Sequence, residues 1–351
     1  MSKVSLKNCK VLVVGGAGFV GSNLSHFLLS HKDVSELWIV DNLISADIVN
    51  VPDHSKVHFI FGSIADDRVL QKLPSDLNVV FHLACYHGNQ SSIADPIADH
   101  DNNTLTSLKL FEQLKEFEEL KKVVYAAAGC AVAEKTYDEA TATSEDAPVS
   151  LFHDSPYSIS KLIGEMYGNY YFQQYGLPFV KARFQNVYGP REILGAGSWR
   201  GTHHTVWRNV TPTFIWKSLC GESLPLDNGG NASRDFIYVD DIVRGLVACA
   251  EQGEPGEAYN LASGVETTIL ELAELINQIT GNATPLDLKP ARDWDRSGKR
   301  FGSVEKSKKM INFDAETSIK EGLISTVNWT KQNRTHIESS ISKHDLFMIK
   351  N

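Results

Sequence analysis

Two side chains that can exchange protons, Tyr157 and Lys161, stand four positions apart in the chain. Side chains at this spacing lie on one face of a helix, and Pro156 just before them is typical of a first helical position. A nearby cation lowers the pKa of a phenol from its usual value of about 10. We therefore expect Lys161 to lower the pKa of Tyr157 and let it exchange protons with a substrate hydroxyl. The same spacing also occurs in ordinary surface pairs.

Glycines at positions 15, 18 and 21 form a second group with chemical meaning. They follow an apolar run at 11–14, typical of a buried strand, and they precede apolar residues at helical spacing. Such glycines permit a tight turn, a close approach of the backbone to a pyrophosphate, and close packing of helix on strand. The free N–H groups of the helix start also favour phosphate. This unit predicts a dinucleotide-binding site.

An acidic residue, Asp41, ends the next apolar run at 36–41, about 20 residues after Gly21. An acid at this place accepts hydrogen bonds from the ribose hydroxyls of adenosine and repels a 2′-phosphate. The spacing therefore predicts NAD, and not NADP, as the cofactor. A carboxylate that only caps the strand end is the alternative.

The elements that must position these residues alternate along the chain. Strand-like apolar runs occur, with helical patterns between them, at 57–62, 79–84, 122–128, 178–184 and 258–261. This alternation predicts an α/β fold with a doubly wound parallel sheet of the Rossmann type. Ligands of such sheets lie beyond the carboxyl ends of the strands, so residues after Ala84 and after Ala127 should share a crevice.

The residues expected to bind NAD surround that crevice. They are Gly15, Gly18, Phe19, Val20, Gly21, Asp41, Asn42, Ser63, Ile64, Leu83, Ala84, Tyr157 and Lys161.

A second, smaller domain is expected to interleave with the first. We assign 1–189 and 235–262 to the NAD-binding domain, 190–234 and 263–330 to a substrate-binding domain, and 331–351 to a polar tail with weak helical character. The irregular segment 191–211 is a candidate substrate lid. Arg234, Arg292 and Arg300 are candidate partners of a second diphosphate, because guanidinium groups pair bidentately with phosphate. Solvated surface charge is the alternative for these arginines.

The composition excludes several classes of protein. The 351 residues carry a formal net charge of −9 and no basic run, which argues against binding to nucleic acid. No apolar run suggests a signal peptide or a membrane span. The five cysteines are scattered without Cys-x-x-Cys spacing, which predicts reduced thiols in a cytoplasmic protein and no metal site.

Together these motifs resemble the extended short-chain dehydrogenase/reductases, in the nucleotide-sugar epimerase/dehydratase branch. The matching residues are Gly15, Gly18, Gly21, Asp41, His82-Leu83-Ala84, Tyr157, Lys161, Asn186-Val187-Tyr188-Gly189-Pro190 and the stretch from Arg234 to Asp241. The resemblance spans about 8–330. It implies an NAD that is used and regenerated within one turnover, and a nucleoside diphosphate sugar as substrate, with uridine favoured. It also implies that Asn186 and Arg234 hold the substrate diphosphate, and that a homodimer forms through helices near 104–117 and 157–175.

One position departs from the family pattern. Ala128 falls where members usually carry Ser or Thr, so only a Tyr–Lys pair remains. Two residues later, Cys130 falls where dehydratases place a glutamate and GDP-mannose 3,5-epimerases a cysteine that moves the proton at sugar C5. Asn102-Asn103-Thr104 and the segment from Arg183 to Pro190 also look most like the 3,5-epimerases.

The chemistry of C5 inversion suits a thiol. A sugar C–H loses a proton only when the carbanion is delocalised, either into a ketone formed at C4 or into a C6 carboxylate. Inversion then needs a base on one face and an acid on the other, and a thiol with a pKa of about 8.5 can serve as either. His87 is the first choice for the opposing group because it titrates near neutrality. His203, His204 and Asn209 are fallbacks, since the lysine of the 3,5-epimerases is missing from the Asn209 segment.

The leading hypothesis is therefore an epimerase acting at C5, or at C3 and C5, of a nucleotide-linked hexose or hexuronic acid. Such sugars feed polysaccharide and lipopolysaccharide O-antigen assembly. A uronic acid substrate would fit both the missing hydroxyl at Ala128 and the thiol of Cys130, because its C6 carboxylate acidifies C5 without oxidation at C4. The alternatives are a UDP-sugar 4-epimerase that transiently oxidises C4, a 4,6-dehydratase, and an inactive NAD-binding sensor or scaffold.

Overall fold

The computed structural model describes residues 3–133, 136–197, 206–292 and 298–348. Its centre is a seven-stranded sheet in the order β11-β7-β5-β4-β1-β2-β3, with every neighbouring pair parallel. The expected doubly wound Rossmann sheet is confirmed. Its strands are β1 (Lys10–Val14), β2 (Glu36–Asp41), β3 (Val57–Phe61), β4 (Val79–His82), β5 (Lys122–Ala128), β7 (Phe179–Phe184) and β11 (Ala258–Leu261).

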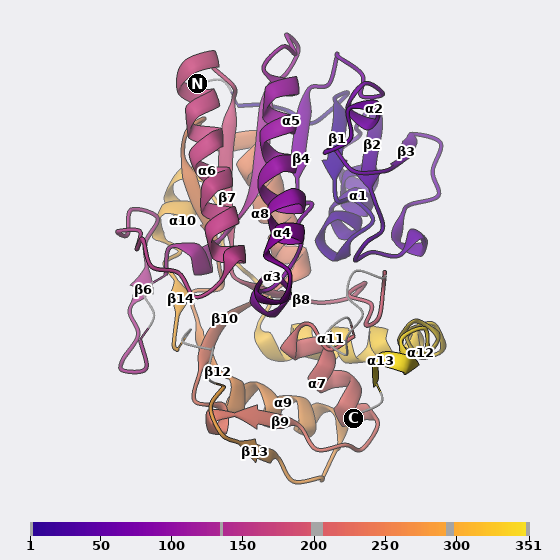
Figure 1. The fold of residues 1–351 in the computed structure, drawn as a ribbon, viewed down its shortest axis with the longest axis vertical. Helices are drawn as coiled ribbons and strands as arrows, with labels where there is room; N and C mark the ends of the chain where they lie inside the picture. The colour runs from indigo at the N-terminus through magenta and orange to yellow at the C-terminus, as the bar shows by residue number, and fades with distance from the viewer. Residues whose placement is uncertain (1–2, 134–135, 198–205, 293–297, 349–351) are drawn as a thin grey trace.

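Two hydrophobic cores lie on the two faces of this sheet. Successive strand residues point to opposite faces, and in β1 Val11 and Val13 enter one core while Leu12 and Val14 enter the other. Helices α1 (Phe19–His31), α8 (Val239–Gln252) and α10 (Glu305–Ile311) cover the first face. The second face carries α2 (Asp67–Leu70), α5 (Thr106–Leu114) and α6 (Pro156–Tyr175), and α5 and α6 run side by side across it (Figure 1).

The helix expected at 104–117 starts differently in the structure. A π-helical segment, η2 (His100–Leu105), precedes α5, after the short helices α3 (Asn89–Ala94) and α4 (Pro96–Asp99). Asn103 in η2 donates to the carbonyl of Tyr86 at 3.2 Å and to Ser160 Oγ at 3.2 Å. These bonds tie η2 both to the loop after β4 and to α6.

A smaller unit lies beyond the carboxyl ends of the strands (Figure 1). Its sheets are β12-β10-β8 and β13-β9, and α7, α9 and α11 pack around them in one core. Its elements are β8 (Asn186–Tyr188), α7 (Val210–Leu219), β9 (Pro225–Asp227), η5 (Asn228–Gly230), β10 (Ser233–Tyr238), β12 (Glu266–Thr268), α9 (Ile269–Thr280), β13 (Asp287–Lys289) and α11 (Ile319–Gln332). The exact division of the chain into domains stays a prediction.

The C-terminal segment, expected to be a polar tail with weak helical character, is helical over most of its described length. It forms α12 (Arg334–Ser342) and α13 (Asp345–Met348). Ile337 is 2% exposed and packs in a cluster with Ile193, Leu194 and Trp216. The sequence pattern looked polar because α12 buries only a narrow apolar stripe. The remaining elements are η1 (Ile48–Asn50), η3 (Gly129–Ala131), and the paired strands β6 (Ala142–Thr143) and β14 (Phe301–Gly302).

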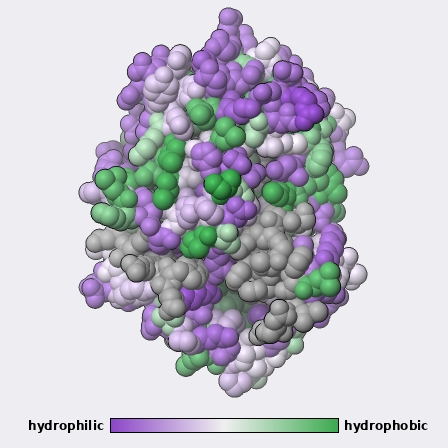
Figure 2. All heavy atoms as spheres, viewed as in Figure 1, coloured by the Kyte–Doolittle hydropathy of each residue, from purple (hydrophilic) through white to green (hydrophobic). Residues whose placement is uncertain are grey.

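The face with α3–α6 toward the viewer carries apolar side chains between polar ones (Figure 2). Exposed apolar residues on these helices include Ile97 of α4, and Ile159 and Met166 of α6, at 70%, 44% and 54% exposure. Among the described helices, none combines the length and apolar character that crossing a bilayer would need.

Candidate active site

The glycine turn after β1 has no room for a side chain at Gly15 or at Gly21. Gly15 has φ +84°, and a Cβ there would lie 2.6 Å from the Ala84 nitrogen. A Cβ on Gly21 would lie 2.1 Å from the carbonyl oxygen of Gly15. Gly18 precedes α1 without a side-chain cap, so the first helical turn presents backbone N–H groups for an anion.

Asp41 is fixed at the end of β2. Its carboxylate accepts hydrogen bonds from the backbone N–H groups of Ala17 at 3.0 Å and Leu43 at 2.8 Å. Burial raises the pKa of Asp41, and the backbone N–H groups of Leu43, Ala17 and Gly18 only partly offset this rise. Asp41 therefore does cap the strand end, as the alternative interpretation has it, and it also stands on the wall of the cavity beside the glycine turn.

One cavity of about 1100 Å³ unites the residues predicted from sequence. Every residue expected to bind NAD lines it, and so do Cys130, His87, Asn186, Asn209, Arg234, Arg292 and Arg300. His203 and His204 lie outside the described residues. The bare glycine backbone at one helix start and the carboxylate at the end of the next strand fit a dinucleotide such as NAD.

Tyr157 and Lys161 lie one helical turn apart near the start of α6, where Pro156 holds the first position and Ser155 caps the helix. Both are buried, and Lys161 Nζ donates to the carbonyl of Ala126 at 2.7 Å. Burial raises the pKa of Tyr157 well above its usual value, and the nearby Cys85 and Cys130 add to the rise. Burial also lowers the pKa of Lys161. The direction is opposite to the expected lowering of the Tyr157 pKa, because desolvation of the buried phenol dominates.

Cys130 belongs to η3, the single turn that follows β5. The turn approaches Gln185 closely, since a Cβ on Gly129 would lie 2.3 Å from Gln185 Nε2. Cys130 is half-buried and packs against a small cluster that includes Ala128 and Tyr157. The thiol thus lies beside the phenol, while Ala128 offers the phenol no hydroxyl.

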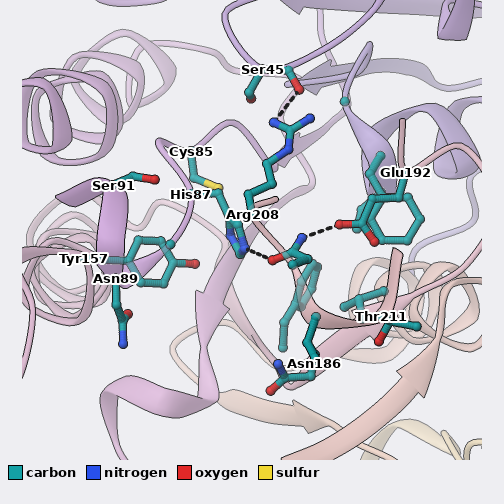
Figure 3. Close-up of a pocket in the computed structure, with 18 of the residues that line it drawn as sticks. Ser45, Cys85, His87, Asn89, Ser91, Tyr157, Asn186, Glu192, Arg208 and Thr211 are labelled. Atoms are coloured by element: carbon teal, nitrogen blue, oxygen red, sulfur yellow. Dashed lines mark hydrogen bonds between the residues drawn. The ribbon is translucent and has the colours of Figure 1, made fainter. Parts of the chain in front are cut away.

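His87 lies in the loop after β4 and is part of a chain of side chains that crosses the cavity wall. Its Nε2 lies 3.0 Å from Asn209 Oδ1, and the amide nitrogen of Asn209 donates to Glu192 (Figure 3). Its ring packs edge-to-face on Tyr157 with centroids 5.7 Å apart. Burial lowers the pKa of His87, but the neighbouring Cys85, the hydrogen bond to Asn209 and the charge of Glu192 outweigh burial, so the pKa is raised.

Three further residues of this wall were not predicted. Cys85 precedes His87 by two residues in the loop after β4, Glu192 is buried with a pKa raised by that burial, and Arg208 donates to the carbonyls of Ser45 and Ile193. Position could have suggested two of them. Cys85 follows directly after Ala84, and Glu192 follows the Asn186–Pro190 motif by two residues.

The arginines expected at a substrate diphosphate already have partners. Arg234 donates to the carbonyls of Ser233 and Gly298, both at 2.6 Å, and Arg292 forms an ion pair with Asp227. Both line the cavity, but Arg292 is exposed, so the surface-charge alternative stays open for it. In the described part of the chain, no group of His, Cys, Asp and Glu side chains could hold a metal ion.

Comparison with known proteins gives a consistent assignment. Residues 11–262 match the model of the NAD dependent epimerase/dehydratase family. The enzyme WbmF of Bordetella bronchiseptica, solved with NAD+ and UDP, is 57% identical over 97% of both chains, with a TM-score of 0.86. An epimerase of Methanothermobacter thermautotrophicus is 35% identical over 95% of this chain and 96% of its own, also with a TM-score of 0.86. A UDP-glucose 4-epimerase of Thermotoga maritima, solved with UDP-glucose, is 29% identical over 93% of this chain and 99% of its own, with a TM-score of 0.83.

Proposed function

Because the chain belongs to the NAD-dependent epimerase/dehydratase family of nucleotide-sugar enzymes, we propose that it inverts C5, or C3 and C5, of a nucleoside diphosphate hexose or hexuronic acid. The inversion removes a proton from one face of the sugar ring and returns one to the other face. Bound NAD supplies reversible oxidation of a sugar carbinol, and a ketone so formed at C4 acidifies the C–H groups at C3 and C5.

The observation that carries this proposal is that the thiol of Cys130 and the imidazole of His87 both pack near the phenol of Tyr157 in one cavity. Cys130 packs with Tyr157 from the end of β5, and His87 packs on Tyr157 from the end of β4. Both side chains line the cavity. A substrate carbon held near the Tyr157 hydroxyl would then have one proton-transfer group from each strand end, which is what inversion needs.

Ala128 supports a hexuronic acid in particular. Without a hydroxyl at this position, Tyr157 has less help in removing a proton from the C4 hydroxyl, and Lys161 is tied to a backbone carbonyl. A C6 carboxylate acidifies C5 without oxidation at C4. Rapid reduction of bound NAD on addition of the true substrate would contradict this part of the proposal.

UDP is the proposed nucleotide, because WbmF was solved with UDP and the Thermotoga enzyme with UDP-glucose. Asn186, Arg234, Arg292 and Arg300 are the proposed holders of its diphosphate. We also propose a homodimer through α5 and α6, with exposed apolar residues such as Ile159 and Met166 on α6. A cytoplasmic location is in line with five free thiols, and we propose a role in supplying sugars for polysaccharide or O-antigen assembly.

Product stereochemistry tests the proposal. The protein would be incubated with UDP- and GDP-linked hexoses and hexuronic acids, and the products analysed by NMR. We expect inversion at C5, or at C3 and C5, that is lost in Cys130→Ala. Cys220→Ala is the matched control, because Cys220 is an exposed thiol at the end of α7, and it should keep full activity.

A 4-epimerase is the second candidate, favoured by the similarity to the Thermotoga enzyme and by the Tyr157–Lys161 pair. Inversion at C4 alone that survives in Cys130→Ala would replace the first proposal with this one. Loss of water from the sugar would instead indicate a dehydratase. Tight binding of NAD and UDP without turnover of any sugar would indicate a sensor or scaffold.

A further inference from the structure

Gln185 is the single residue between β7 of the large sheet and β8 of the smaller unit, and no step of the proposed reaction uses it. It lines the same cavity as Cys130. Parallel pairing places Phe184, the last residue of β7, beside Ala128, the last residue of β5. The residues that follow, Gln185 and Gly129, therefore lie next to each other at the carboxyl edge of the sheet, where ligands of such folds bind.

Two glycines make room for the side-chain amide of Gln185. A Cβ on Gly129 would lie 2.3 Å from Gln185 Nε2 and 2.9 Å from its Oε1. A Cβ on Gly302, at the end of β14, would lie 2.9 Å from the same Nε2. β14 is itself held in place, because the backbone N–H of Gly302 donates to Asp235 Oδ2 at 3.2 Å. The amide is therefore positioned by two separate segments of the chain, one of which is the turn that carries Cys130.

The amide of Gln185 has hydrogen-bonding groups that the protein leaves unused. Within the described ranges of the chain, its side-chain nitrogen and oxygen form no hydrogen bond with another residue. A primary amide offers two N–H donors and one acceptor oxygen. Gln185 is half-buried in the cavity wall, and a few polar groups so placed are what orients a ligand in a binding pocket. A bound molecule with an acceptor oxygen fits these donors.

Inversion at C5 of a hexuronic acid creates negative charge close to Cys130. When the Cys130 thiolate takes the C5 proton, the C–H bond breaks and its electron pair forms a double bond between C5 and C6. The π electron pair of the C6 carbonyl moves onto oxygen, so the carboxylate gains a second negative charge. When the His87 imidazolium donates a proton to the other face of C5, the C–H bond forms again and the electron pairs return. Because C6 is bonded to C5, its oxygens lie near Cys130 whenever C5 does.

We propose that the side chain of Gln185 donates a hydrogen bond to the C6 carboxylate of the substrate and stabilises the charge that develops there when C5 loses its proton. The inference rests on the proposed function and commits it to one substrate class, a nucleoside diphosphate hexuronic acid. Donors that are fixed before the reaction stabilise developing charge without reorganisation. The packing of the amide against Gly129 and Gly302 supplies this fixation.

Ligand binding tests the contact with C6 without any turnover. The full-length protein, loaded with NAD, would be titrated with UDP, UDP-glucose and UDP-glucuronic acid in a calorimeter. Gln185→Glu keeps the shape of the side chain but replaces the N–H donors with a carboxylate that repels the C6 carboxylate. We expect its affinity for UDP-glucuronic acid to fall by at least about 10-fold, while the affinities for UDP and UDP-glucose stay as in the wild type. Wild-type affinity of Gln185→Glu for UDP-glucuronic acid, or an equal loss for UDP-glucose, would overturn the proposal.

Kinetics test the stabilisation of charge. Gln185→Met keeps the length of the side chain and removes both donors, so with the sugar that the wild type inverts we expect kcat to fall by at least about 10-fold and KM to change less. Iodoacetamide should label Cys130 at the wild-type rate in this variant, which a displaced turn would not allow. Gln71→Met is the matched control, because Gln71 is exposed after the end of α2. An unchanged kcat in Gln185→Met, or a lower kcat together with altered labelling of Cys130, would overturn the assignment. If the wild type inverts C5 of no sugar, the proposed function fails, whatever the titrations show.

Discussion

The imidazole of His87 is surrounded by groups that favour its charged form, and this gives a pH prediction at the scale of single residues. The neighbouring Cys85, the hydrogen bond to Asn209 and the charge of Glu192 raise its pKa against the effect of burial. The imidazolium is therefore present below that pKa and lost as the pH rises through it. Asn209→Ala removes one hydrogen bond and the link to Glu192.

We expect the pKa of His87 to fall in Asn209→Ala and the alkaline limb of kcat/KM to move to lower pH. NMR titration of the His87 ring, assigned by comparison with His87→Gln, measures the first effect, and the pH–rate profile measures the second. Asn282→Ala is a matched control, because Asn282 bonds to Glu222 and not to the wall beside His87. An unchanged titration of His87 in Asn209→Ala would show that the hydrogen bonds through Asn209 to Glu192 do not set the charge of His87.

Sequence reasoning found the motif residues of the cavity wall but not the interactions within it. Gly15, Asp41 and Tyr157 were predicted because each belongs to a motif of fixed spacing. Cys85 and Glu192 belong to no such motif, and Glu192 is linked to His87 through Asn209 only because separate loops come together in the fold. The sign of the Tyr157 shift was mispredicted because burial cannot be read from a four-residue spacing.

At the scale of elements, the turn between β1 and α1 has no room for a side chain at Gly21. A Cβ there would lie 2.1 Å from the carbonyl oxygen of Gly15. Gly21→Ala must therefore displace the backbone that would face the pyrophosphate. We expect the affinity for NAD to fall by at least about 10-fold, as measured by calorimetry.

The control for this change is Gly281→Ala, at the left-handed end of α9, where an added Cβ meets no atom within 4 Å. Alanine at this φ of +77° should cost about 1 kcal/mol of folding stability and leave NAD binding unchanged. Equal NAD affinity in Gly21→Ala and in the wild type would contradict the assignment of this turn to the cofactor.

His82 at the end of β4 makes the folding stability of the protein depend on pH. It is 1% exposed, and burial and the nearby Lys161 lower its pKa to about 3. In the unfolded chain it would titrate near 6.5, so below that pH the unfolded state binds more protons and stability is lost. At pH 5 this loss amounts to about 2 kcal/mol, from about 1.4 kcal/mol per pH unit.

Urea unfolding at pH 7.5 and at pH 5 would measure this loss of folding stability. His82→Gln should lose about 2 kcal/mol less between the two pH values than the wild type does. If the two proteins show the same pH dependence, His82 is not the buried neutral group described above.

Secondary structure followed from the sequence where apolar periodicity was strong. The bounds of β2, β5 and β11 match the predicted runs, because each strand is buried along most of its length. The predicted start of the helix at 104 differs from the start of α5. The residues of η2 have the apolar spacing of a helix, but their hydrogen bonds are those of a π-helix. No periodicity distinguishes the two.

At the scale of the whole molecule, α12 joins two loops that form the cavity. His336 Nε2 pairs with Asp47 Oδ2 at 3.1 Å, next to the loop that follows Asp41. Ile337 packs on Ile193, which lines the cavity beside Glu192. The C-terminal helix therefore braces both the proposed cofactor side and the proposed lid.

Ile337→Ala should lower the folding stability of the protein by about 2–4 kcal/mol, as for other buried aliphatic truncations, and weaken binding of both NAD and UDP. Calorimetry with each ligand measures the effect. Leu346→Ala is the control, because Leu346 is 84% exposed. Ligand affinities in Ile337→Ala equal to those in Leu346→Ala would show that α12 does not support the cavity.

The central claim is that two groups on opposite faces of the sugar remove and return the C5 proton. The most direct measurement is a short reaction in heavy water, stopped early, with deuterium at C5 quantified by NMR in the product and in the recovered substrate. Two separate acid/base groups predict deuterium in nearly every product molecule and little in the recovered substrate. Equal deuterium in both pools would indicate one shared group, and a product inverted without deuterium at any ring carbon would contradict the proton-transfer mechanism altogether.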